Sequence, residues 1–384
     1  MRVLEIENLE IAYRVAGSGS AKAVDGVSLA IAEGEYLGLV GESGCGKSTI
    51  AKAILGILPQ TAHVTGSIRY RDRELIALKA PEMRRIRWRD IALIPQSAMN
   101  GFDPVYDIES QIAEAIAAHE QMPSAARHAR AAELFAMVGL PETRLKDYPH
   151  QFSGGMRQRA MIAMAFALSP KLIVADEPTT GLDVIVQDQI LARIDEIRAS
   201  ERHAMLLITH DMALVSENCD RIAVMYAGRI VEYGGAEVFG VPSHPYTMGL
   251  VNAFPSYDPP LEGGSKFLSA SEKISRRGHS RAIPLPEPDI AAAPLRRSST
   301  LPQGEGKIRE LISIPGTPPS LIDPPFGCRF RERCPFTTER CTQEDPPLAE
   351  VAPGHFTACH YAGKAAEFRA AAREPETWRR TAQA

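Results

Sequence analysis

One nine-residue stretch combines residue types and spacing that could bind the phosphates of a nucleotide. It reads Gly-Glu-Ser-Gly-Cys-Gly-Lys-Ser-Thr over 41–49, after the apolar run 35–40 and before an apolar segment that predicts a helix. In such a G-x-x-x-x-G-K-[ST] loop, glycines let backbone N–H groups face phosphate oxygens, and the helix adds the positive end of its dipole. Lys47 would then reach the β- and γ-phosphates, and the Ser48 hydroxyl would ligate Mg²⁺. The loop residues that we assign to nucleotide binding are Gly41, Ser43, Gly44, Cys45, Gly46, Lys47, Ser48 and Thr49.

Two adjacent carboxylates follow a second apolar run. The residues Leu-Ile-Val-Ala over 172–175 predict a buried strand that ends at Asp176 and Glu177. Because parallel strands end at one edge of their sheet, Asp176 should lie beside the phosphate loop and supply a second ligand to Mg²⁺. Glu177 would lie near the γ-phosphate, where it can hold or deprotonate an attacking water. Alone, these residues could be a strand that meets a solvated loop, but the phosphate loop favours the metal site.

Two further segment ends carry candidate phosphate contacts. Residues 152–159, Phe-Ser-Gly-Gly-Met-Arg-Gln-Arg, precede a long apolar helix. Ser153, Gly154 and Gly155 would therefore form a second anion site at a helix N-terminus. The apolar strand predicted over 204–209 ends at His210, which places an imidazole where it could contact a γ-phosphate.

The order of the predicted elements indicates an α/β fold. Short apolar runs typical of buried parallel strands alternate with amphipathic, Ala-rich helices. The predicted strands cover 35–40, 171–176 and 204–210, the helices 109–119, 125–139 and 155–168, and a hairpin 221–234. The sequence therefore predicts a sheet core interrupted by a helical insertion. This unit occurs once, because no internal repeat is visible.

All these elements, in this order, resemble the nucleotide-binding subunit of an ABC transporter over about residues 1–250. The resemblance implies a RecA-like P-loop domain with a helical signature subdomain, which binds ATP and Mg²⁺ and hydrolyses ATP to drive transport. It also implies that Ser153, Gly154 and Gly155 bind the γ-phosphate of ATP held by an opposing protomer. Met156 stands where the family signature commonly has Gln. Because Ser153 and backbone N–H groups make most of the anion contact, we expect this site to be competent.

The resemblance assigns roles to residues outside the phosphate loop as well. Tyr13 would stack on adenine, although it could also be an aromatic residue on an edge strand. Gln96, in Leu-Ile-Pro-Gln-Ser, would touch Mg²⁺ and signal to membrane subunits. Asp183, in Gly-Leu-Asp-Val, would couple two nucleotide sites across an interface. His210 would be the switch histidine, and it joins Glu177 and Gln96 as a predicted catalytic residue.

Several longer stretches resemble the ATPases of oligopeptide and dipeptide permeases more specifically. They cover 148–190, 244–255, 314–330, 334–336 and 351–360. This resemblance implies peptide cargo, but it extends to importers of oligosaccharides, nickel and opines. It also implies two transmembrane permease subunits, a second and paralogous ATPase, and a periplasmic or extracellular substrate-binding protein. The chain is then expected at the cytoplasmic face of the inner membrane as a peripheral subunit.

Composition and spacing argue against soluble ABC ATPases that serve DNA or translation. The 384 residues carry 43 Lys and Arg against 47 Asp and Glu, a net charge of −4, which predicts no nucleic-acid partner. A chromosome-type protein would need a long coiled coil between Lys47 and Ser153, and a translation-type factor usually carries two such domains. No apolar run reaches the ~20 residues of a membrane-spanning helix, so we expect membrane contact only through a partner.

Proline density suggests where the chain divides. Between 255 and 325 lie 13 of the 29 prolines, in a polar and partly basic stretch that cannot bury enough apolar surface to fold alone. We predict an ABC domain over 1–256, a flexible Pro- and Arg-rich linker or insertion over 257–306, and a C-terminal extension over 307–384. An ordered Pro-rich loop that lies on a partner is the alternative for the middle segment.

Four cysteines gather in the C-terminal extension: Cys328, Cys334, Cys341 and Cys359. In a reducing compartment such a cluster favours a metal over disulfides. Structural zinc sites prefer pairs spaced by two to four residues, and this extension has none. Four converging thiolates suit an iron–sulfur cluster, and the permease resemblance also implies [4Fe–4S]. We predict a structural [4Fe–4S] cluster, with zinc or free thiols as the alternatives.

Overall fold

The computed structural model describes residues 1–15, 17, 19–96, 101–179, 187, 190, 202–253 and 313–379. Met1–Phe254 and Ile312–Ala384 belong to one unit, and the other unit, Pro255–Leu311, lies outside the described residues. The predicted linker over 257–306 therefore also lies outside them. The proposed domain boundaries stay a prediction.

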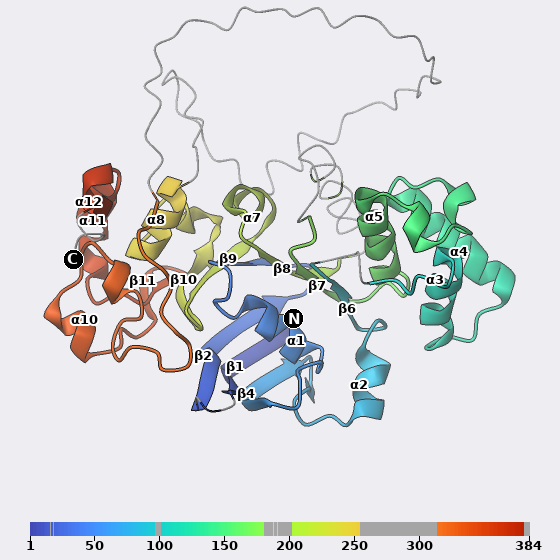
Figure 1. The fold of residues 1–384 in the computed structure, drawn as a ribbon, viewed down its shortest axis with the longest axis horizontal. Coiled ribbons are helices and arrows are strands. Elements are labelled where there is room, and N and C mark those ends of the chain that lie inside the picture. The colour runs from blue at the N-terminus through green and yellow to red at the C-terminus, as the bar shows by residue number, and fades with distance from the viewer. Residues whose placement is uncertain are drawn as a thin grey trace, which may run out of the picture. The chain divides into compact units, whose positions relative to one another are not determined.

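An eight-stranded sheet runs through the first unit in the order β11-β12-β10-β9-β3-β8-β7-β6 (Figure 1). Strands β9, β3, β8, β7 and β6 are parallel to one another, and β10, β12 and β11 continue the sheet antiparallel. β3, β7 and β8 are buried along their whole length, as their continuous apolar sequences predict. The strands are β3 Tyr36–Val40, β6 Ile91–Ile94, β7 Leu172–Asp176, β8 Ala204–Thr209, β9 Arg221–Tyr226, β10 Arg229–Gly235, β11 Ala349–Ala352 and β12 His355–Thr357.

A four-stranded antiparallel sheet has the order β2-β1-β4-β5. Its strands are β1 Arg2–Val15, β2 Gly19–Ala32, β4 Ala62–Tyr70 and β5 Arg73–Glu74. Helix α1, Lys47–Ile54, shares one apolar core with both sheets: its Ile50 packs in the same cluster as Leu4 of β1 and Leu39 of β3. This packing fixes the helix that follows the phosphate loop, and with it the direction of the N-terminal amides.

The predicted helical insertion is confirmed by three helices next to β6 (Figure 1). Phe135 of the second helix and Phe152, just before the third, meet edge to face at 6.4 Å in their common core. The hairpin predicted over 221–234 is confirmed as β9 and β10. The helices before the C-terminal segment are α1, α2 Ala80–Ile86, α3 Ile108–Ala117, α4 Ser124–Met137, α5 Gly154–Ala165, α7 Met212–Asn218 and α8 Pro245–Ala253, with 3₁₀ turns η2 Glu142–Arg144, η3 Pro149–Gln151 and η4 Ala236–Val238.

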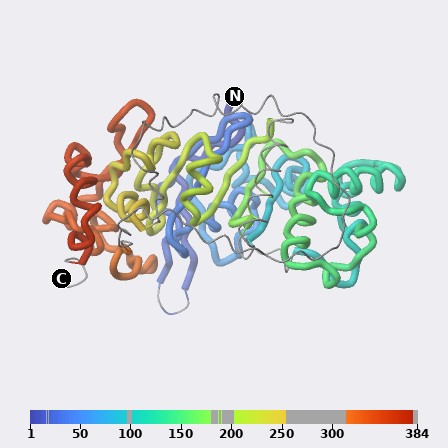
Figure 2. Tube along the Cα trace, turned by 90° about the horizontal axis from the view of Figure 1, so that it is seen from above, coloured from blue at the N-terminus to red at the C-terminus, as the bar shows by residue number. Residues whose placement is uncertain are grey.

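The C-terminal segment 313–379, which we call the C-terminal lobe, joins the large sheet through β12. There Glu232 pairs with Thr357 and Tyr233 with Phe356. Helix α11 packs on α8, far apart in sequence but adjacent in the fold (Figures 1 and 2). The lobe's other elements are η5 Arg331–Arg333, α10 Glu339–Gln343, η6 Ala362–Lys364, α11 Ala365–Ala372 and α12 Pro375–Arg379. Across the described residues, every helix is too short or too polar to cross a membrane.

Candidate nucleotide site

The phosphate loop connects the carboxyl end of β3 to α1 in a space that only glycine fits. A Cβ at Gly41 would lie 2.1 Å from the Met225 carbonyl oxygen, and one at Gly46 would lie 2.1 Å from the Ala23 carbonyl oxygen. Gly46 also has a φ of 112°, which favours glycine. The loop is thus held between β2 and β9, with α1 beginning at Lys47. This arrangement gives the turn and the helix N-terminus that phosphate binding requires.

Lys47 and Ser48 lie where the loop meets β7. The Lys47 ammonium donates to the carbonyls of Gly41 and Glu42, at 2.7 and 2.9 Å, and is largely buried. The Ser48 hydroxyl donates to Asp176 Oδ1 at 3.0 Å. Burial, more than its neighbour Glu177, raises the pKa of Asp176. A hydroxyl beside a buried carboxylate suits Mg²⁺, a hard cation that prefers oxygen ligands and would favour the charged form of Asp176.

The three predicted catalytic residues meet at one carboxylate. Gln96 Nε2 donates to Glu177 Oε2 at 3.0 Å, and His210 Nδ1 lies 3.4 Å from Glu177 Oε1. Glu177 follows β7 with a φ of 48°, in the left-handed region that a non-glycine residue seldom adopts. Such strain persists where the surrounding structure imposes it, and it clusters at functional sites. The geometry can therefore hold a carboxylate at a fixed angle beside the phosphate loop.

Tyr13 lies beside Thr49, the last residue of the phosphate loop. Its hydroxyl is 3.4 Å from Thr49 Oγ1 on the first turn of α1. The ring belongs to β1 and is only partly buried. This position is compatible with the predicted stacking role.

The predicted signature residues do not lie with the phosphate loop of the same chain. Ser153 is the N-cap of α5, where its Oγ accepts a hydrogen bond from the Met156 N–H at 3.3 Å. Figure 1 places α5 with the other helices of the insertion, apart from α1. Ser153 and Gly154 are exposed. Asp183 lies outside the described residues.

Glu42, the second residue of the loop, makes a contact that the sequence does not predict. Arg333 of the C-terminal lobe binds both carboxylate oxygens of Glu42, at 2.8 and 3.0 Å. The two residues are 291 positions apart, and no local pattern marks either of them. A pair of that kind leaves a signal only in the folded chain or in covariation between relatives.

Comparison with known proteins identifies the family. The family model of the ABC transporter matches residues 24–180. The oligopeptide transport protein OppD of Escherichia coli is 36% identical over 360 residues, covering 93% of this chain and 92% of that protein. The dipeptide transport protein DppD of the same organism is 37% identical, covering 94% and 97%. This chain belongs to the ABC transporter ATP-binding proteins.

Two further comparisons refine that membership. The model of the oligopeptide/dipeptide transporter C-terminal region matches residues 231–277 and 298–341 of this ABC protein. The dimeric bacterial ABC transporter cassette MJ0796 has a TM-score of 0.56 at 27% identity, covering 61% of this chain and 98% of that one. The RecA-like ABC fold, ATP binding and ATP hydrolysis are therefore established for this chain.

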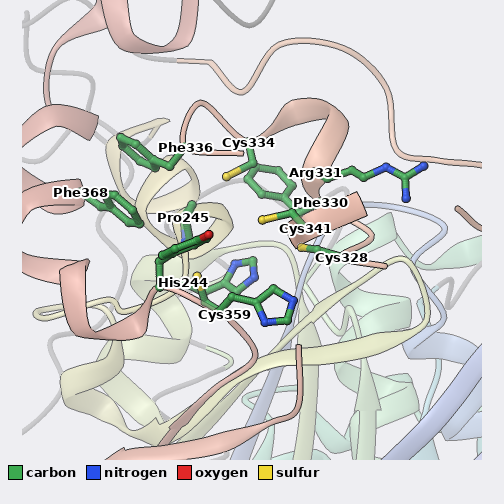
Figure 3. A pocket seen from close by; sticks show the side chains of 12 residues that line it. His244, Pro245, Cys328, Phe330, Arg331, Cys334, Phe336, Cys341, Cys359 and Phe368 are labelled. Carbon is green, nitrogen blue, oxygen red and sulfur yellow. The ribbon is translucent and has the colours of Figure 1, made fainter. Parts of the chain in front are cut away.

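The four C-terminal cysteines line one pocket, together with Phe330, Phe336 and Phe368 (Figure 3). All four are free thiols. Burial raises the pKa of Cys328 to about 11 and also raises that of Cys334 and Cys359. Among the described residues, however, no group of three or more His, Cys, Asp or Glu side chains is arranged to hold a metal ion. The [4Fe–4S] cluster therefore stays a prediction.

Proposed function

We propose that this chain is the ATP-hydrolysing subunit of an importer of dipeptides or oligopeptides. The observation that carries the proposal is that similarity to OppD and DppD runs through the cassette and the C-terminal region alike. A cassette alone would leave the cargo open, because one fold serves many functions. Importers of oligosaccharides, opines or nickel are the alternatives, and they become outcomes of the test below.

The proposed reaction uses the residues that meet beside the phosphate loop. Lys47 and the loop N–H groups bind the β- and γ-phosphates. Ser48, Asp176 and Gln96 would hold Mg²⁺, which neutralises phosphate charge during phosphoryl transfer. Glu177 accepts the proton of the attacking water, and its contacts with Gln96 and His210 hold the carboxylate in place.

A second ATPase subunit completes the site in this proposal. The exposed N-terminus of α5 at Ser153 lies apart from the chain's own phosphate loop, which leaves it available to the nucleotide of a partner. The solved cassette MJ0796 is dimeric. We favour a paralogous partner, as the permease resemblance implies. The signature of each subunit would then bind the γ-phosphate in the other.

Permease subunits have a candidate docking surface on the helical insertion. Val105 and Tyr106 are 68% and 57% exposed and lie shortly after Gln96 in the chain, and Tyr148 is also exposed. Because Gln96 contacts Glu177, a partner on this surface would be coupled to the hydrolytic centre. This supports a peripheral position at the cytoplasmic face of the membrane, with two permease subunits and, through them, a substrate-binding protein.

The test is reconstitution with the permease subunits, second ATPase and binding protein from neighbouring genes. We expect a low ATPase rate for the chain alone and stimulation when peptide-loaded binding protein is added to proteoliposomes. Lys47→Ala should abolish the stimulation, because it removes the phosphate contact. Stimulation by Ni²⁺, an opine or an oligosaccharide in place of peptide would overturn the peptide assignment. Full, non-cooperative activity of the monomer would overturn the transport assignment.

We further propose that the four thiols of the C-terminal lobe ligate a [4Fe–4S] cluster. What supports this is that all four line one pocket without forming disulfides. Each thiolate binds a different iron of such a cluster, so its ligands stand farther apart than those of a single ion. Iron would also favour the thiolate forms, which burial alone disfavours.

The full-length chain, purified without oxygen, should absorb near ~400 nm and contain about four irons. Cys334→Ser should lose the absorbance, whereas Cys219→Ser, at a buried cysteine outside the lobe, should retain it. A colourless wild-type chain, or one zinc per chain, would contradict the cluster.

A further inference from the structure

The C-terminal lobe reaches the phosphate loop through a bidentate ion pair. Arg333 Nη1 and Nη2 donate to the two Glu42 oxygens at 2.8 and 3.0 Å. The Arg333 side chain is 7% exposed, and Nη1 also lies 3.3 Å from the Tyr226 hydroxyl. Nε donates to the Pro315 carbonyl at 2.8 Å. These contacts fix the position of the Arg333 guanidinium, as bidentate carboxylate binding requires.

The backbone of Glu42 is held from the same side. Its N–H donates to the Tyr246 hydroxyl at 2.9 Å. Tyr246 is fully buried and packs against Tyr226 at 4.6 Å and Phe330 at 5.4 Å between ring centroids. Phe330 belongs to the lobe and lines the cysteine pocket. Both the amide and the carboxylate of Glu42 thus depend on groups outside the loop.

A second arginine supports the other end of the loop. Arg329 pairs with Asp25 and donates to the Ala227 carbonyl. The N–H of Asp25 donates to the Gly228 carbonyl, and the N–H of Gly228 donates to the Cys45 carbonyl, each at 2.9 Å. Arg329 follows Cys328 and Arg333 precedes Cys334, so both arginines are adjacent to thiols of the pocket.

These contacts bear on ATP because Lys47 depends on Glu42. The Lys47 ammonium donates to the carbonyls of Gly41 and Glu42, so a shift of Glu42 moves the ammonium that binds the phosphates. We propose that Arg333 is a positioning residue of the ATP site, which acts through Glu42 to keep the phosphate loop in its binding conformation. The C-terminal lobe then sets the affinity of the cassette for ATP.

Calorimetric titration of the full-length chain with Mg-ATP tests the proposal. Arg333→Met and Glu42→Gln should each raise the Kd about 10-fold, a typical coupling between linked sites. Because they act through one contact, the double variant should be no weaker than either single variant. Arg333→Lys should have a Kd between those of wild type and Arg333→Met, since lysine keeps the charge but cannot bind both carboxylate oxygens as the planar guanidinium does. Arg340→Met, which removes an exposed pair with Glu344 in the same lobe, should leave the Kd unchanged.

In the assembled transporter the KM for ATP should rise while kcat stays within about 2-fold, because Arg333 touches no reacting group. Folded Arg333→Met with the wild-type Kd would overturn the proposal, and so would effects of Arg333→Met and Glu42→Gln that multiply in the double variant. If Arg333→Met does not fold, Glu42→Gln and Arg333→Lys decide: a wild-type Kd in both overturns the proposal, and a raised Kd in both supports it.

Discussion

Apart from Tyr13 of β1, the residues that meet at the phosphate loop follow the carboxyl ends of four adjacent parallel strands, β3, β8, β7 and β6. The C-terminal lobe has no such frame among its described residues. Its strands and helices have at most eight residues each, and it attaches through β12, the α8–α11 contact and buried ion pairs. In the cassette, backbone topology positions the side chains. In the lobe, individual side-chain contacts position the backbone, so single substitutions should act differently in the two regions.

The largest expected effect comes from a substitution in the cassette that nearly abolishes ATP hydrolysis and leaves folding intact. Glu177→Gln should lower the ATPase rate of the assembled transporter by about 100- to 10,000-fold, the usual contribution of a general base. Mg-ATP binding should persist, because Lys47, Ser48 and Asp176 remain. Steady-state turnover and calorimetric binding measure the two properties. Turnover at the wild-type rate would show that another group takes the proton.

The matching change, at Glu232 of β10 where the lobe attaches, should affect stability instead. Glu232 is fully buried, and its carboxylate accepts from His355 Nε2 of β12 at 2.7 Å and from the His244 N–H at 3.0 Å. Glu232→Ala leaves these partners unpaired and should lower the free energy of unfolding by about 3 kcal/mol. Urea unfolding followed by circular dichroism checks it. Glu350→Ala, on the exposed strand β11, is the control and should leave the free energy of unfolding nearly unchanged. Equal urea midpoints for the two variants would contradict the expected role of Glu232.

Packing between α8 and the lobe gives a smaller effect. A Cβ at Gly249 would lie 2.6 Å from Ile314 and 2.7 Å from Trp378, both of which cover α8. Gly249→Ala should therefore cost about 1–3 kcal/mol of stability, although alanine favours a helix. Gly363→Ala meets nothing within 4 Å and serves as the control. If Gly249→Ala were more stable than wild type, the lobe would accommodate the added methyl group without strain, and its packing against α8 would not be tight.

The same difference explains what the sequence can predict. The residues at Lys47, Ser48, Asp176 and His210 stand at fixed offsets from apolar runs, so recognising a strand also places its terminal side chain. Tyr13 and Gln96 needed the family resemblance, because one aromatic residue or one amide is no signal alone. The Glu42–Arg333 pair could not be predicted, since nothing local distinguishes one arginine among the many in the lobe. Likewise, the cysteine spacing predicts a gathering of thiols but not which ligand they bind.

The smallest expected effect is a pH dependence of stability that comes from Asp25. Burial alone would raise the pKa of Asp25, but the cations Arg329, Arg229 and Lys22 outweigh it, so the net shift is downward. A carboxyl whose folded pKa is depressed stabilises the fold above its unfolded pKa, near 3.9, and this stability is lost as the pH falls through the folded pKa. We therefore expect the stability advantage of wild type over Asp25→Asn to be full at pH 7 and to shrink below about pH 4. Because only the difference between the folded and unfolded pKa contributes, the pH-dependent part should be smaller than the effects at Glu232 and Gly249. Urea midpoints measured from pH 7 to 3 test this, and an advantage that grows toward pH 3 would mean that Asp25 is not the carboxylate that secures the lobe to β2.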